Sequence, residues 1–179
     1  MPKTDAGRLA DYIAITQLKA RYGRCIDLKR WDVLPTLFTA DARCEGFGGV
    51  NHAVDIATFV AGVAKRLDGA VTVHHFHQPD VVFTGADRAK AIWAMMDYNE
   101  WPRPIGLPGA PEAPGFQGFG FYEEAYRRVG EAWRIDVMRL VRLRVDPLPQ
   151  RDPAQPGPFT PAPGWLRPSP DWLGVMAAR

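Results

Sequence analysis

Histidine side chains crowd one short stretch of the chain, residues 74–77, and histidine is the group best suited to exchange protons near neutral pH. Residues 71–83 alternate in a way that predicts a β-strand, on which His75 shares one face with Val71 and Val73. A histidine with valines on its own face is expected to point into an apolar interior. His75 is therefore our candidate general base, and the alternative is a buried structural histidine or one that faces solvent.

The elements that would hold such a base follow from the spacing of apolar residues. Apolar residues recur at helical spacing in the first part of the chain and with a period of two from residue 71 onward. Helices are predicted at residues 8–28, 33–38 and 51–67, and strands at 42–47, 71–83, 89–101, 116–129 and 132–145. Helices followed by long antiparallel strands indicate an α+β fold, in which the sheet curls, the helices cover one face, and a conical cavity forms between them.

Proline divides the chain into a body and a tail. Nine of the seventeen prolines lie in residues 146–179, which excludes regular helix or strand pairing over most of that stretch. The same tail carries Phe159, Trp165 and Trp172, and large apolar groups are uncommon in disordered linkers. We expect residues 1–147 to form one catalytic domain and residues 148–179 to form a Pro-rich arm, pinned on a surface by these aromatic rings.

Charge and composition exclude several classes of protein. The chain has 22 basic and 20 acidic residues and a net charge of +2, so nothing favours nucleic acid or an anionic membrane as a partner. The apolar stretches are too short to cross a bilayer, and residues 1–5 lack the apolar segment of a signal peptide. Cys25 and Cys44 fit reduced thiols, although a bridge between them stays open. We expect a soluble cytoplasmic protein that acts on a small molecule.

Several segments together resemble a known family. The first half of the chain contributes Arg21-Tyr22, Asp27, Trp31-Asp32, Leu37-Phe38, Asp41-Ala42 and Val73-His74-His75-Phe76. The second half contributes Gly85-Ala86-Asp87, Tyr122-Glu123-Glu124 and Trp133-Arg134-Ile135. Over residues 8–147 this order resembles SnoaL-like proteins of the nuclear-transport-factor-2-like superfamily, which implies a cone-shaped α+β roll. Members include dehydratases, a dehydrochlorinase, isomerases, cyclases, epoxide hydrolases and non-catalytic subunits, so the fold is implied more narrowly than the function.

The resemblance is nearest to the scytalone dehydratase, lindane dehydrochlorinase and bile-acid dehydratase group, and it implies a catalytic dyad. In that group an aspartate at the end of the first helix pairs with a strand histidine, and Asp27 and His75 match those positions. A carboxylate bonded to one ring nitrogen fixes the tautomer and stabilises the imidazolium that forms when the other nitrogen takes a proton. The alternative for Asp27 is a surface charge at a helix end.

Further polar side chains are implied as parts of the same pocket. Tyr22 lies on the apolar stripe of the first helix and resembles the tyrosine that orients a carbonyl or a leaving hydroxyl, although it could equally be a core residue. Arg139 resembles a pocket arginine, and strand alternation places it inward and Arg142 outward unless a bulge exchanges them. Asp97 resembles the acidic residue of the bile-acid enzyme, and the sequence leaves open whether Asp97 or Tyr98 faces the pocket.

Aromatic residues on the predicted strands would line the pocket, and these are Trp93, Trp101, Phe116, Phe119 and Phe121. They favour an aromatic, polyphenolic or alicyclic substrate. We predict a cofactor-independent lyase, most simply a dehydratase, in which His75 removes a proton while Tyr22 and Arg139 stabilise developing negative charge. Loss of halide or retro-aldol cleavage would use the same base.

Two other kinds of protein stay open. His75 and His77 form a His-x-His pair that could hold a metal with His52 or Asp97, although the resembling enzymes use none and we expect none here. A non-catalytic ligand carrier or dioxygenase small subunit would need no dyad at all.

The resemblance also implies an oligomer. The resembling dehydratases are trimers, so we expect a homotrimer, with a two-fold dimer as the alternative. Its interface would use the outer face of the sheet, where we place Ile92, Tyr126 and Met138.

Overall fold

The computed structural model describes residues 4–47 and 52–150. By its internal contacts the chain divides into two units, Met1–Leu148 and Pro149–Arg179. The second unit contains most of the predicted Pro-rich arm, and the expected anchors Phe159, Trp165 and Trp172 lie outside the described residues. The candidate site belongs to the first unit alone.

Helices and strands of the first unit follow the predicted order. The helical elements are α1 (Asp5–Asp27), the 3-10 helix η1 (Leu34–Leu37) and α2 (Ile56–Arg66). The strands are β1 (Phe38–Glu45), β2 (Val54–Asp55), β3 (Val71–Phe83), β4 (Arg88–Glu100), β5 (Gly115–Val129) and β6 (Ala132–Pro147). Two differences have local causes. The helix predicted from residue 51 begins at Ile56, since Asp55 caps it by accepting the Thr58 N–H at 2.8 Å, and β2 is too short to show a period.

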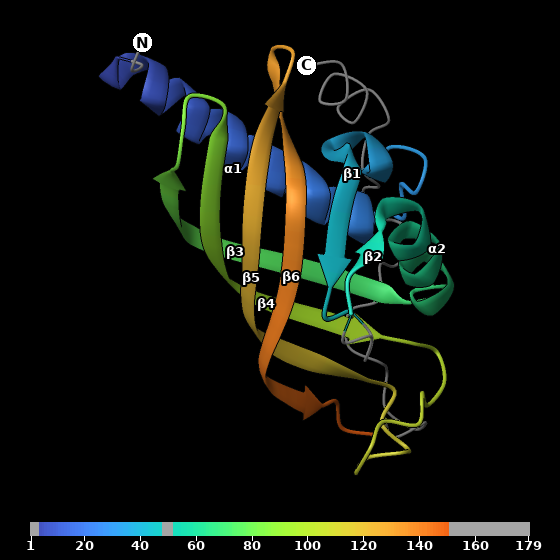
Figure 1. The fold of residues 1–179 in the computed structure, drawn as a ribbon. Coiled ribbons are helices and arrows are strands. Elements are labelled where there is room, and N and C mark those ends of the chain that lie inside the picture. Colours follow the sequence, from blue (N-terminus) through green and yellow to red (C-terminus); the bar gives the residue numbers. More distant parts are fainter. Residues whose placement is uncertain (1–3, 48–51, 151–179) are drawn as a thin grey trace, which may run out of the picture. The chain divides into compact units, whose positions relative to one another are not determined.

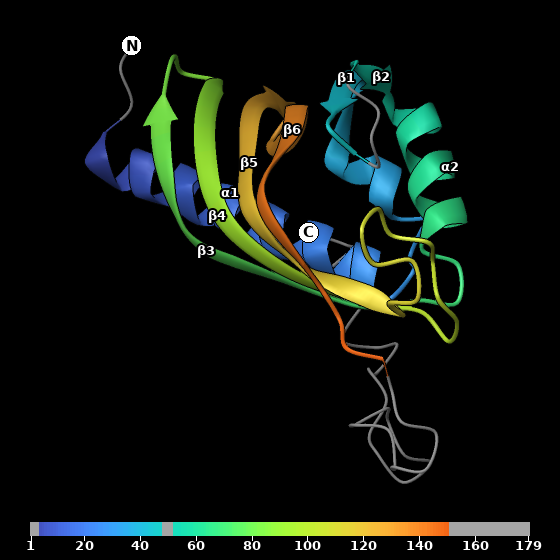
Figure 2. The ribbon, with the colours of Figure 1, turned by 90° about the horizontal axis from the view of Figure 1, so that it is seen from below.

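The strands form one sheet in the order β2-β1-β6-β5-β4-β3. Neighbours pair antiparallel, except that β1 runs parallel to β6. Figures 1 and 2 show β3 to β6 as long, strongly bent strands, with α1 crossing one face and α2 beside β1 and β2. The sheet therefore has an inner face covered by α1 and an outer face, which confirms the predicted α+β fold.

Helix α1 covers the inner face because its apolar residues share one side. The Thr4 hydroxyl caps its first turn, and Ile15 and Leu18 are buried against the sheet. At Gly23 the helix lies so close to β3 that a Cβ would collide with the ring of Phe76. This close approach brings the C-terminal end of α1 within hydrogen-bonding reach of β3.

An irregularity in β6 decides which of its arginines face inward. Ile135 and Met138 are both fully buried although they are three residues apart, so the inner and outer faces exchange between them. The pairing of β6 with β5 skips Asp136 at this point, as in a β-bulge. Arg142 consequently faces the interior and Arg139 faces outward, which reverses the alternation expected from the sequence.

The outer face of the sheet exposes apolar side chains. Val82, Ile92 and Leu143 are 56%, 48% and 67% exposed. Ile92 was expected there, but Tyr126 and Met138 were placed there wrongly, because both are buried on the inner side. No helix in the described ranges is long and apolar enough to cross a bilayer.

Candidate active site

A cavity of about 620 Å³ lies between α1, α2 and the inner face of the sheet. Its polar lining comes from both helices and from β3, β4, β5 and β6, and consists of Tyr22, Arg66, His74, Asp97, Asn99, Tyr122 and Arg142. Apolar side chains make up most of the remaining wall, with Trp101 and Phe116 among them. A mostly apolar cavity with a few converging polar groups is typical of a small-molecule site.

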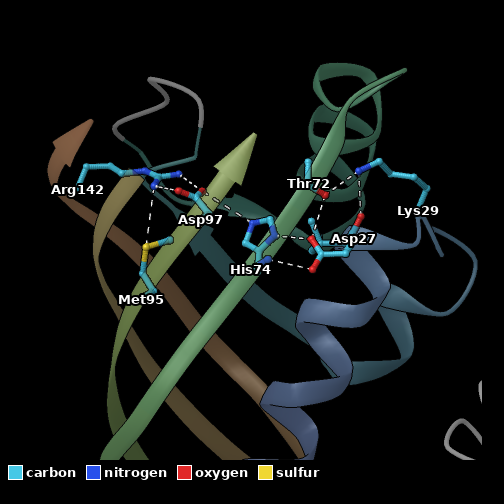
Figure 3. A network of polar contacts seen from close by, with 8 residues as sticks. Asp27, Lys29, Thr72, His74, Met95, Asp97 and Arg142 are labelled. Atoms are coloured by element: carbon cyan, nitrogen blue, oxygen red, sulfur yellow. Dashed lines mark hydrogen bonds and ion pairs between the residues drawn. The ribbon is translucent and has the colours of Figure 1, made fainter. Parts of the chain in front are cut away.

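Asp27 and His74 form a close polar pair beside this cavity. The Asp27 carboxylate, at the end of α1, lies 2.7 Å from His74 Nδ1 and also accepts the His74 backbone N–H at 2.9 Å. Because an ionised carboxylate can only accept, Nδ1 is the ring nitrogen that donates to Asp27, and in the neutral imidazole this tautomer leaves the lone pair on Nε2. Nε2 lies on the cavity side, 3.9 Å from an oxygen of Asp97 (Figure 3).

Thr72 holds Asp27 in place and is itself held by Lys29. The Thr72 hydroxyl donates to Asp27 at 2.9 Å, and Lys29 Nζ donates to that hydroxyl at 2.8 Å. Lys29 reaches this position from a left-handed residue just after α1, with φ of 58°. Burial lowers the pKa of the Lys29 amine, and the charge of Asp27 works in the opposite direction. Asp27 is therefore fixed by three hydrogen bonds, one from Thr72 and two from the side chain and backbone of His74.

Asp97 faces His74 from the next strand and is itself paired with Arg142. The Arg142 guanidinium donates to both carboxylate oxygens, at 2.5 and 2.6 Å, in the two-pronged geometry that matches a carboxylate best. Gly118 makes this possible, because a Cβ at that position would collide with both the guanidinium and the carboxylate. His74 therefore lies between two carboxylates, one of which is neutralised by an arginine (Figure 3).

Two tyrosines form the apolar end of the cavity wall. The hydroxyls of Tyr22 and Tyr122 are joined by a hydrogen bond, and their rings meet edge to face with centroids 5.8 Å apart. Burial raises the pKa of both phenols. Both hydroxyls therefore stay protonated at neutral pH and can donate hydrogen bonds but cannot act as bases.

The buried ammonium group of Lys19 packs against these rings. Lys19 Nζ lies 3.5 Å from the ring centroid of Tyr122 and 4.4 and 4.5 Å from those of Phe76 and Tyr22, as in a cation–π cage. It is paired with the equally buried Glu124. Burial lowers the pKa of Lys19 to about 8 although the charge of Glu124 raises it.

The sequence matches the model of a known protein family. A family model described as a SnoaL-like domain matches residues 7–139, most of the sequence. The chain belongs to the SnoaL-like domain family. The predicted resemblance to this family is confirmed.

Solved structures of other proteins share the fold of this SnoaL-like chain. A scytalone dehydratase-like protein of Novosphingobium aromaticivorans is 14% identical, with 83% of this chain and 94% of that chain covered and a TM-score of 0.68. The corresponding values for a hexachlorocyclohexane dehydrochlorinase of Novosphingobium barchaimii are 16%, 84%, 99% and 0.68. For a protein classed as the beta subunit of an aromatic-ring-hydroxylating dioxygenase from N. aromaticivorans they are 18%, 79%, 99% and 0.57. At these identities the likeness shows a shared fold alone.

Two of the residues predicted for the site point away from it. His75 lies exposed on the face of β3 opposite to His74. Val71 and Val73, which share that face, are 45% and 41% exposed, so the face that the valines indicated is the outer one. Arg139 lies on the outer face beyond the bulge and is paired with Glu123 and Glu45. The placement of His75 was wrong because apolar residues of this sheet also face outward, and that of Arg139 was wrong because the bulge exchanges the faces of β6.

The remaining predicted residues divide between the cavity and the rest of the body. Tyr22, Asp97 and Phe116 line the cavity. Tyr98 lies on the other face of β4, where its hydroxyl donates to Glu100 at 2.7 Å.

Two of the predicted pocket aromatics lie elsewhere. Trp93 is buried away from the cavity and donates its indole N–H to the Tyr126 hydroxyl at 2.8 Å. Phe119 follows Gly118 on β5 and so faces outward. Of the two β4 residues between which the sequence could not choose, Asp97 lines the cavity and Tyr98 does not.

Sequence reasoning missed His74, Arg142 and Tyr122. One signal was available, since Gly118 and Gly120 on β5 leave space on the inner face for long side chains of β6. The His75–His77 metal pair cannot include Asp97, because the strand face that carries the two histidines is opposite to the one that meets Asp97. Within residues 4–47 and 52–150, no cluster of three or more His, Cys, Asp or Glu side chains could hold a metal ion.

Proposed function

We propose that this SnoaL-like protein is a lyase whose general base is His74, held by Asp27. The observation that carries the proposal is the position of the imidazole, with Nδ1 2.7 Å from Asp27 and Nε2 on the cavity side. In this arrangement Nε2 accepts a proton from a substrate carbon, and the electron pair of the broken C–H bond forms the new double bond. General-base catalysis of this kind contributes about 10²–10⁴-fold to a rate.

The charges around His74 support its role as a proton acceptor. When Nε2 takes a proton, the imidazolium lies between Asp27 at 2.7 Å and Asp97 at 3.9 Å, so the positive charge forms where negative charge is already fixed. The pairing of Asp97 with Arg142 keeps that carboxylate in place beside His74.

The two tyrosines would stabilise the oxygen that leaves the substrate. Tyr22 and Tyr122 both line the cavity, and their hydroxyls are protonated donors. As the C–O bond breaks, its electron pair goes to the leaving oxygen, which accepts a hydrogen bond from this pair. It then takes the proton that His74 removed from carbon, so that water departs and the imidazole is neutral again. Loss of water is therefore the reaction that we propose, and loss of halide is the alternative on the same base.

The cavity wall favours a ring substrate. Trp101 and Phe116 line it with ring centroids 6.2 Å apart, and Phe47 adds a third aromatic side chain near Tyr122. These surfaces fit an aromatic, polyphenolic or alicyclic molecule.

A general assay can separate a lyase from a ligand-binding subunit. Incubation in D₂O with ketones and hydroxylated ring compounds, followed by NMR, reports proton abstraction even when no group is eliminated. Exchange at a carbon next to a carbonyl, or release of water from a hydroxylated substrate, is expected for wild-type protein and lost in His74→Ala. Tight binding of such compounds without exchange or elimination by the wild type would instead identify a carrier or a dioxygenase-type subunit.

Homo-oligomer formation through the outer sheet face belongs to the same proposal. A hollow on that face combines Val82, Ile92 and Val137 with charged side chains of both signs, Lys90, Glu123 and Arg139. Apolar residues rimmed by mixed charges are typical of a surface that contacts another protein, and a second copy of the chain carries the same complementary set. We favour a trimer, with a dimer as the alternative.

A further inference from the structure

Asn99 stands out among the polar residues of the cavity. It lies on β4 two residues beyond Asp97, is 3% exposed, and lines the cavity opposite Phe116 on β5. Its amide nitrogen is buried and forms no hydrogen bond with any residue that the structure describes. A buried amide donor without a partner has lost its hydrogen bonds to water and gained none in return, so such groups are uncommon unless something else satisfies them.

The other buried polar side chains of the cavity already have partners within the protein, and Arg66, which also lines the cavity, is exposed. Asp97 and Arg142 bind each other, Tyr22 and Tyr122 are joined by a hydrogen bond, and His74 is held by Asp27. Within the described part of the chain, Asn99 is the cavity residue with a buried side-chain donor that has no hydrogen-bond partner.

We propose that Asn99 is a specificity-determining residue that binds an acceptor oxygen on the far side of the substrate ring. Residues two apart on a strand are separated by about 6–7 Å, so this oxygen lies about that far from the reacting end of the cavity at Asp97 and His74. This is roughly the span of one six-membered ring with an oxygen opposite the reacting carbon. The substrate class is therefore a ring compound that carries a carbonyl or hydroxyl oxygen across the ring from the carbon that loses its proton.

The aromatic walls beside Asn99 fit this assignment. Phe116 is its cross-strand neighbour, and Trp101, two residues further along the chain, also lines the cavity. A ring held by these faces would present its edge to the amide, because hydrogen-bonding substituents lie in the plane of the ring.

The inference rests on the proposed function only for the position of the reacting carbon, so its test uses binding and not turnover. The probes are para-hydroxyacetophenone and para-methylacetophenone, which have nearly the same shape and differ in the oxygen opposite the carbonyl group. Dissociation constants are measured by NMR titration for wild type, Asn99→Leu and His74→Ala. Leu107→Ala, at another cavity-lining residue without a hydrogen-bonding group, serves as the control.

We expect the wild type to favour the hydroxyl probe and Asn99→Leu to lose about tenfold or more of affinity for it, because the buried hydroxyl loses its partner. Affinity for the methyl probe should stay within about threefold or improve, and Leu107→Ala should affect both probes alike. His74→Ala should keep the discrimination, so a failed dyad and a failed Asn99 assignment give different results.

A second measurement separates a binding role from a structural one. Ligand-free Asn99→Leu should melt at the same temperature as wild type or higher, because leucine replaces an unpartnered buried amide. A clearly lower melting temperature, or equal effects of Asn99→Leu on the two probes, would overturn the proposal and assign the amide to the protein interior.

Discussion

The guanidinium of Arg142 and the carboxylate of Asp97 bind each other through two hydrogen bonds, 2.5 and 2.6 Å long, in the wall of the cavity. The side chain of Asp97 is only 2% exposed, so this guanidinium takes the place of water around it. Arg139, three residues earlier on the same strand, makes ion pairs of a different kind, with partners that are 35–43% exposed on the outer face. The two arginines therefore form a matched pair for experiment.

Replacement of Arg142 by methionine should destabilise the protein much more than the same change at Arg139. Loss of Arg142 leaves the buried Asp97 charge uncompensated, and we expect the free energy of unfolding to fall by about 2–4 kcal/mol. Arg139→Met removes exposed ion pairs and should cost less than about 1 kcal/mol. Urea unfolding of both variants decides the matter, and equal losses would contradict the inward placement of Arg142.

Histidine substitutions on β3 give the sharpest test of the catalytic proposal. His74→Ala should reduce exchange or elimination by about 10²–10⁴-fold, whereas His75→Ala, one residue away and facing outward, should leave it nearly unchanged. Asp27→Asn should keep the fold and lose a similar factor, because an amide no longer fixes the Nδ1–H tautomer. Steady-state rates with the best substrate from the D₂O screen would measure this, and a fully active His74→Ala would disprove the dyad.

The pH dependence of stability should report the buried Lys19. Its pKa is lowered to about 8 in the folded protein from an ordinary value of 10.5, so between these values the unfolded chain binds more protons. Stability contributed by this group therefore rises as the pH increases from about 8 toward 10.5, with a slope of at most about 1.4 kcal/mol per pH unit.

Comparison with the double variant Lys19→Met/Glu124→Gln isolates that contribution, because the variant removes both buried charges together. The wild type should gain stability relative to this variant when urea unfolding is repeated at about pH 7 and about pH 9.5. A difference that stays constant with pH would mean that the ammonium remains charged in its aromatic cage.

Activity should survive removal of metal ions. The proposed steps use an imidazole base, carboxylates and phenol donors, and none of them requires a Lewis acid. Rates measured before and after prolonged dialysis against a chelator should agree, with elemental analysis to verify that metal is gone. A rate that collapses on dialysis and returns with added zinc or iron would redirect attention to the exposed His75 and His77.

A charge on the outer sheet face should break the proposed homo-oligomer. Ile92→Glu places a carboxylate in the apolar hollow between Val82 and Val137, where it would be buried in an interface without a partner. The molar mass by light scattering should fall from that of a trimer or dimer to that of a single chain. Leu9→Glu, at a position 60% exposed on α1, is the control that should keep the wild-type mass. Identical masses for all three proteins would refute an interface at this face.

The sequence alone determined the kinds and order of the elements. Helical spacing in the first part of the chain and alternation from residue 71 onward are local properties, and they predicted the helices and the four long strands correctly. The order of short motifs along the chain resembled the family that the comparison confirms. Tyr22, Asp97 and Phe116 were also placed at the cavity, because each lies on an element whose inner side the pattern or the resemblance indicated.

Only the tertiary structure decided which side of each strand is the inside. On β3 the valines that indicated an inward His75 lie on the apolar outer face, and on β6 a single extra residue exchanged Arg139 for Arg142. Side chains on a strand alternate with a period of two, so an error of one residue moves every side chain to the opposite face. A bulge depends on the pairing of two strands distant in sequence, and the unpartnered amide of Asn99 depends on all the elements around the cavity. Neither feature can be predicted from the local order of residues.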